Sequence, residues 1–286
     1  MQTRQLLLVA VVAAAVALAG CGALQQGSGP NGNQTQGPGG DNAEWPATLP
    51  ASADGTHAQL LANADGYVSV LNLTVRSQQQ SSGSGTTHID SVYRIDNRRS
   101  AYLLRRSVGA GAFEQTTTRF TNDTATYLRS QYGGQASYSS DTPPYDGSSI
   151  GSVKPVNATE AQGPRISTLF NFSAGGVDAS AVTYAKTGTD TVDGRKVAVY
   201  AANATQLRRA MQRATNASSS SSQNRITNAT ATVERTADGL LVSKHLRVAF
   251  HSENGDGSLE YDYRVRQVGD VTVSPPEWVP KAAQGS

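Results

Sequence analysis

Alternation of apolar and polar residues with a period of two dominates the chain after residue 65 and most constrains its fold. It is clearest in two runs near the C-terminus, LLVSKHLRVAF at 240–250 and LEYDYRVRQV at 259–268. A period of two gives each strand one buried and one solvated face. Such strands form antiparallel sheets that pack on one side and meet water on the other.

Turn sequences and helical segments divide the alternating runs. Asp193-Gly194 and Asp238-Gly239 tolerate the positive φ that tight hairpins require. Apolar residues with helical spacing occur at about 56–64, 166–170 and 205–214. Thr205 is the expected N-cap of the last helix. The predicted order is therefore helix, five or six strands, helix, two strands, helix, three strands.

This order predicts an α+β fold with one strongly curved antiparallel β-sheet, a half-barrel. A single sheet of about 10–11 strands must curl. The three short helices are each apolar on one face and are expected to cover the concave face of the sheet. Residues 51–281 are expected to form this single antiparallel half-barrel domain.

The N-terminus has the features of an export signal. Arg4 precedes an uninterrupted apolar stretch at 6–18, which is shorter than the about 20 residues of a membrane span. Leu18-Ala19-Gly20-Cys21 resembles the lipobox of secreted lipoproteins, in which the signal is cut before the cysteine and the thiol receives a lipid. The alternatives are an ordinary signal peptide with a chance cysteine and a short buried helix.

This interpretation assigns residues 1–20 to a lipoprotein signal peptide and residues 21–50 to a disordered tether rich in Gly, Gln, Asn and Pro. Cys21 is the only cysteine, so its lipidation would leave the mature chain without a disulfide or a thiolate metal site. Stable anchoring requires two acyl chains. The protein is therefore expected to be exported and held at the outer face of the cell membrane through lipidated Cys21.

Two stretches near the C-terminus carry a family resemblance. TVERTADGLLVSKHLRVAF and YDYRVRQVGDVTVSPPEWV, together with the lipobox and tether, resemble haloarchaeal surface lipoproteins of unknown function. The same ending is similar to the last hairpin of the lipoprotein-carrier fold (LolA, LolB and LppX-like proteins), at Asp238-Gly239-Leu240, Pro275-Pro276 and Trp278. The resemblance implies a curved half-barrel whose helix-covered concave face holds acyl chains. The resemblance extends over residues 51–280 in the order of the helices and strands. No site residue is transferred from the family to this chain.

The sequence predicts a non-enzyme without metal, cofactor or nucleic-acid partner. The G-x-S-x-G match at 147–151 has prolines on both sides, which prevent the strand and helix of a nucleophile elbow. His245 and His251 would lie about 20 Å apart along one strand, too far to share a metal ion. His57 is expected on the apolar side of a helix, as a residue at the edge of the buried face and not as a ligand. A formal net charge of +2 argues against nucleic-acid binding.

Two groups of arginines have two possible interpretations. The first group is at residues 98, 99, 105 and 106, and the second at 208, 209 and 213. Both either contact anionic lipid headgroups or are solvated charges.

The apolar residues on one face of the long strands are the candidate lining of a ligand cavity. They are Leu71, Leu73, Ile89, Tyr93, Leu246, Val248, Tyr261 and Tyr263. Arg247, Asp262 and Arg264 are expected on the opposite face, because a shift of one residue exchanges the two faces. Sequons suggest glycosylation, and the candidates are Asn72, Asn122, Asn157 and Asn216.

Two functions from different classes remain open. The first is an anchored lipoprotein that binds a lipid or another apolar ligand without catalysis. The alternative is a structural or adhesive protein of the cell envelope with a filled core and no pocket. A hydrolase is disfavoured because no triad pattern is present.

Overall fold

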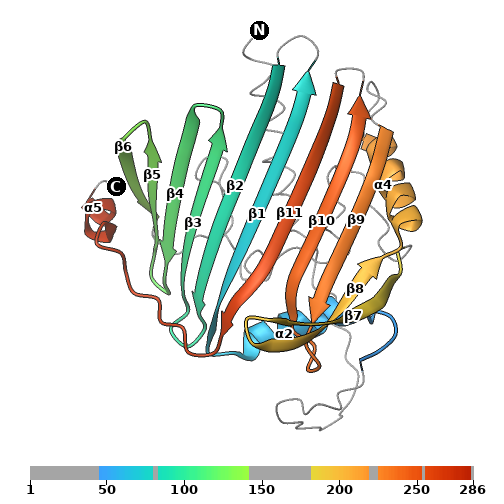
Figure 1. Ribbon diagram of the computed structural model, residues 1–286. Coiled ribbons are helices and arrows are strands. Elements are labelled where there is room, and N and C mark those ends of the chain that lie inside the picture. Colours follow the sequence, from blue (N-terminus) through green and yellow to red (C-terminus); the bar gives the residue numbers. More distant parts are fainter. Residues whose placement is uncertain (1–44, 80–82, 142–181, 219–224, 253–254, 285–286) are drawn as a thin grey trace.

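A computed structural model describes residues 45–79, 83–141, 182–218, 225–252 and 255–284. They form one antiparallel sheet with the strand order β6-β5-β4-β3-β2-β1-β11-β10-β9-β8-β7 (Figure 1). The sheet does not close, because β6 and β7 are its two edges. This open, curved sheet agrees with the predicted half-barrel.

The order of the strands along the chain is the predicted one, and their bounds are as follows. They are β1 Gly66–Gln79, β2 Gly83–Asp96, β3 Ala101–Ala110, β4 Phe113–Thr121, β5 Thr126–Tyr132, β6 Gln135–Asp141, β7 Tyr184–Val192, β8 Arg195–Ala202, β9 Arg225–Arg235, β10 Leu241–Ser252 and β11 Gly255–Val268. The helices are α2 Ala53–Asn63, α4 Ala204–Ser218 and α5 Val279–Gln284. The helix expected at 166–170 lies outside the described residues.

A seam between β1 and β11 joins two meanders in the middle of the sheet. Strands β1 to β6 form one meander and β7 to β11 the other. At the seam Leu71 lies opposite Tyr263 and Leu73 opposite Tyr261. The strands nearest the two ends of the chain are thus direct neighbours.

One face of the sheet, here called the inner face, carries the main hydrophobic core. Leu73, Tyr93 and Leu246 are among its buried residues. Helix α2 packs against β1 and β10, and α4 packs against β9. Leu61 of α2 and Leu207 of α4 are fully buried in this core. Two of the predicted helices therefore cover the predicted apolar face.

The opposite face, here called the outer face, carries a second hydrophobic cluster that the sequence did not predict. After β11 the chain turns back toward β5 and β6 and ends in α5 (Figure 1). Val273, Trp278 and Ala282 of this segment pack with Phe120, which alternation assigns to the outer face. Helix α5 therefore does not join α2 and α4 on the inner face.

The folded part includes residues that were expected to belong to the tether. Thr48 forms an antiparallel bridge with Ala185 of edge strand β7. The N–H of Leu49 donates to the Tyr184 carbonyl at 2.9 Å, and Trp45 and Leu49 pack against the main core. The domain thus begins before residue 51, with residues 45–50 covering part of one sheet edge.

Helix α4 begins two positions earlier than a cap at Thr205 would allow. The Gln206 N–H donates to Oδ1 of Asn203 at 3.1 Å, and the Leu207 N–H donates to the Asn203 carbonyl at 2.9 Å. Asn203 is therefore the N-cap, which is a role that asparagine fills well. The expectation of Thr205 was wrong because two good capping residues lie close together.

Candidate functional site

All eight predicted ligand-lining residues lie together on the inner face. They come from β1, β2, β10 and β11, which are adjacent strands. Each has a relative exposure of 6% or less. The structure therefore confirms that these alternate residues share one face of the sheet. It places them within the packed core.

A band of polar groups interrupts this apolar surface. Ser69 and Ser91 are fully buried between the tyrosines of the inner face. Arg106 donates from Nε to the Ser91 hydroxyl and from Nη2 to the Tyr93 hydroxyl, each at 3.2 Å. Arg119 is also buried, opposite Leu104. The inner face is thus amphipathic, with its arginines toward β3 and β4.

A buried lysine lies near the apolar centre of the inner face. Lys244 is 1% exposed, and its Nζ lies 3.2 Å from Oδ1 of Asp54 in α2. The same ammonium lies 5.5 Å from the centroid of the Tyr263 ring. Burial lowers the pKa of Lys244, and the neighbouring Asp54 carboxylate partly opposes this. Lys244 alternates with Val242 and Leu246 on one face of β10, so the period of two indicates that it is buried.

His57 lies on the apolar side of α2, as expected, and is buried in the same layer rather than at its edge. It is 2% exposed, and its Nδ1 accepts a hydrogen bond from the Leu241 N–H at 3.3 Å. Its ring meets the Tyr263 ring edge-on, with centroids 6.1 Å apart. His57 is therefore an acceptor that fixes the end of β10 against α2.

The tyrosine hydroxyls of the inner face differ in their partners. Burial raises the pKa of both the Tyr261 and the Tyr263 hydroxyls well above the ordinary value. Tyr263 has a hydrogen bond with Ser69. The Tyr261 hydroxyl is buried and has no hydrogen-bond partner in the described part of the chain. Such an unpaired hydroxyl costs about 1–3 kcal/mol, so it calls for an explanation.

Replacing Asp54 with asparagine is expected to lower stability most at neutral pH. The change leaves Lys244 without its carboxylate, which for a buried pair costs about 3 kcal/mol. A lysine whose folded pKa lies below its unfolded value of 10.5 binds its proton more tightly in the unfolded chain. Stability therefore rises with pH between these two pKa values. Urea unfolding at pH 7 and pH 10 should show a smaller deficit at pH 10.

The double variant Asp54→Asn/Lys244→Met is the control. Because it removes both charges, it should recover most of the lost stability and its deficit should not change with pH. A single-variant deficit that is equal at both pH values would contradict a charged Lys244 in the folded protein.

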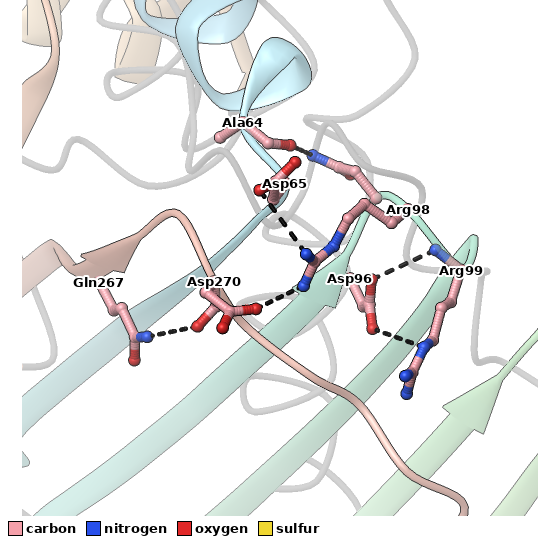
Figure 2. Close-up of polar contacts among 8 residues, drawn as sticks. Ala64, Asp65, Asp96, Arg98, Arg99, Gln267 and Asp270 are labelled. Carbon is pink, nitrogen blue, oxygen red and sulfur yellow. Dashed lines mark hydrogen bonds and ion pairs between the residues drawn. The ribbon is translucent and has the colours of Figure 1, made fainter.

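The predicted arginine group at 98, 99, 105 and 106 is divided by the fold. Figure 2 shows Arg98 between Asp65 and Asp270, and Arg99 beside Asp96. Asp96 is 1% exposed, and it accepts from the backbone N–H groups of Arg99 at 3.2 Å and Val273 at 3.3 Å. These contacts connect the end of α2, the β2–β3 turn and the C-terminal segment. Arg98 and Arg99 therefore have a structural role.

The remaining arginines are in different environments. Arg106 faces inward, as described above, and Arg105 is exposed. Arg208, Arg209 and Arg213 are exposed on α4, which is compatible with both interpretations of this group. The first group is thus not one basic patch, because alternation along β3 sends neighbouring arginines to opposite faces.

An open hollow lies at the β7 edge of the sheet. It is lined by Trp45, Pro46, Ala47 and Lys186. The Lys186 ammonium lies 5.3 Å from the centroid of the Trp45 ring. None of the eight predicted lining residues borders this hollow, so it is separate from the inner face.

The other predicted site residues are placed as follows. Cys21, Asn157 and the G-x-S-x-G match lie outside the described residues. Asn72 is exposed in the middle of β1. Asn122 lies between β4 and β5, and its Oδ1 accepts from the N–H groups of Thr124 and Ala125. Asn216 lies in the last turn of α4. Glycosylation of these residues remains a prediction.

No helix in the described residues is long and apolar enough to cross a membrane. The anchor expected at Cys21 lies in a part of the chain that the structure does not describe. Anchoring therefore remains a prediction from the sequence.

Comparisons with known proteins give one family and several distant structures. The model of a family described as "Family of unknown function (DUF7537)" matches residues 5–282. No curated protein matches the chain. A chain of the Pseudomonas aeruginosa MucA/MucB complex is 18% identical with a TM-score of 0.27; the match covers 79% of this chain and 59% of that one, less than two thirds of its length.

A second structure comes from the superfamily named in the sequence resemblance. A LolA-superfamily protein from Nitrosomonas europaea is 8% identical with a TM-score of 0.23, over 80% of this chain and 96% of that one. TM-scores this low carry no argument about function. What the protein does must therefore be inferred from its own residues.

Proposed function

The chain belongs to DUF7537, a family of unknown function, and on that premise we propose that it is a non-enzymatic binding protein for an amphiphile. The ligand's apolar chain would lie against the leucines of the inner face, and its polar group would meet the Tyr261 hydroxyl. An N-terminal lipid on Cys21 would hold the protein at the outer face of the cell membrane.

The unpaired Tyr261 hydroxyl is the observation that carries the binding proposal. Buried polar groups nearly always have a hydrogen-bond partner, and this hydroxyl lies among the apolar residues of the seam. A ligand oxygen or nitrogen at this point would satisfy it. Ligand sites typically combine an apolar surface with a few such polar groups, and the inner face has both.

Tyr261→Phe is expected to separate ligand binding from folding. The change removes only an unpaired hydroxyl, so the unfolding free energy should stay equal or rise. Ligand affinity should nevertheless fall, by about 5- to 10-fold for one lost hydrogen bond of about 1 kcal/mol. Mass spectrometry of lipids extracted from natively purified protein identifies the ligand, and rebinding of that compound measures the affinity.

Tyr263→Phe is the matched control on the same strand. Its hydroxyl already bonds Ser69, so the variant should lose about 1 kcal/mol of stability and keep its ligand. If Tyr261→Phe and Tyr263→Phe retain the extracted compound equally, the Tyr261 hydroxyl does not meet the ligand.

A structural or adhesive role is the second candidate, and the close packing of the inner face favours it. All eight predicted lining residues belong to the main core. In that case natively purified protein would release no specific compound on extraction. That result would remove the binding proposal and leave the envelope role.

A further inference from the structure

Two adjacent rows of polar side chains cross the outer face at the seam, on the side opposite the inner face. Cross-strand pairing places each row on β1, β11 and β10 in turn. The first row is Asn72, Asp262 and His245, and the second is Thr74, Glu260 and Arg247. These residues lie on the central strands of the sheet, so the backbone hydrogen bonding between those strands fixes the spacing of the two rows.

Three of these side chains converge. His245, Glu260 and Asp262 each offer one ligand atom, and these atoms all lie within 4.8 Å of one another. The side chains are 32%, 24% and 49% exposed, respectively. They are therefore partly desolvated and still accessible to an ion. In the described part of the chain, no other three His, Cys, Asp or Glu residues converge in this way.

We infer that His245, Glu260 and Asp262 form a binding site for a divalent transition-metal ion such as Zn²⁺. Zinc binds imidazole nitrogen and carboxylate oxygen at about 2.0–2.2 Å, which puts two ligands of one tetrahedral ion about 3.4 Å apart. The observed spacing therefore needs only small rotations of the side-chain ends. One imidazole with two carboxylates favours zinc over Mg²⁺ or Ca²⁺, which prefer oxygen ligands alone.

The direct contact between His245 and Asp262 is compatible with this role. Nδ1 of His245 lies 2.6 Å from Oδ1 of Asp262. A metal ion bound between the two groups would take the place of this direct contact, because zinc binds both imidazole nitrogen and carboxylate oxygen. The fourth position would be open to water. The site is independent of ligand binding on the inner face.

Arg247 would compete with a metal ion for the carboxylate of Glu260. Its Nη2 lies 2.6 Å from Oε1 of Glu260. One oxygen of the carboxylate is therefore already occupied by the guanidinium. Removing the guanidinium should strengthen metal binding. A merely structural ion pair would predict no such gain.

Zinc titration of the full chain tests the site. Isothermal calorimetry is performed on untagged protein in a Cys21→Ser background, which removes the only thiol. We expect one Zn²⁺ per chain and absorption bands of a tetrahedral ion with Co²⁺. His245→Ala and Asp262→Asn should each weaken Zn²⁺ binding at least about 10-fold, and Arg247→Gln should tighten it about 3- to 10-fold.

His251→Ala is the matched control, because it removes a similar pair without a third ligand. Nδ1 of His251 lies 2.6 Å from Oδ1 of Asp256 on the same two strands, and this variant should keep the wild-type affinity. A wild-type chain that binds no Zn²⁺ at millimolar concentration would overturn the site. Equal losses in His245→Ala and His251→Ala would also overturn it, because binding would then be nonspecific.

Discussion

Leu246→Arg should unfold the protein or leave it barely stable. Leu246 is 0% exposed and lies between Tyr261 of β11 and Ala231 of β9. Loss of a buried leucine costs about 2–5 kcal/mol, and an unpaired buried charge adds about 3–5 kcal/mol. The sum is comparable with the whole stability of an ordinary domain, about 5–15 kcal/mol. Urea unfolding and the yield of soluble protein measure the effect.

Arg247→Leu is the control one residue along the same strand. Its side chain is 61% exposed and pairs with Glu260, and an exposed pair of this kind contributes about 0–1 kcal/mol. Arg247→Leu should therefore fold and melt nearly as wild type does. If both variants lost stability equally, the assignment of β10 residues to the two faces would be wrong.

Cys21→Ser is expected to release the protein from the membrane almost completely. The thiol is the only acylation site of its kind in the chain, and the hydroxyl of serine does not receive this lipid. Without acyl chains the residues that follow offer no apolar anchor of their own. Fractionation of cells that express the variant measures the share of protein in the membrane pellet.

Ala23→Ser is the control for this change, because it adds a hydroxyl two residues away and leaves Cys21 in place. It should remain in the membrane fraction like the wild type. Persistence of Cys21→Ser in that fraction after a high-salt wash would show a second anchor and would refute the lipoprotein assignment.

Alternation predicted the strands and their buried faces because it records a local property, the side on which each residue meets the core. Leu71, Tyr93 and Leu246 were assigned correctly for this reason. The same rule assigns Lys244 to the buried face of β10, although its side chain is charged. It would also have separated Arg105 from Arg106, which were grouped only because they are neighbours in sequence.

Features that depend on distant contacts could not be predicted in this way. Val273 and Trp278 pack on Phe120, and no local pattern marks which face a C-terminal segment will cross. The cluster of His245 with Glu260 and Asp262 depends on the register between β10 and β11. Considered along one strand, His245 has only His251 as a possible co-ligand, and the partners that matter lie on the neighbouring strand.

The seam between β1 and β11 sets the order in which the chain can fold. Hairpins within each meander join residues close in sequence, whereas pairing of Leu71 with Tyr263 closes a loop that contains most of the domain. Such long-range closure is slow and comes late. Until β11 has been synthesised, β1 and β10 are both open edges that can pair with other chains. Strand β11 is therefore the segment that completes the sheet, and a truncation that removes it should leave two aggregation-prone halves.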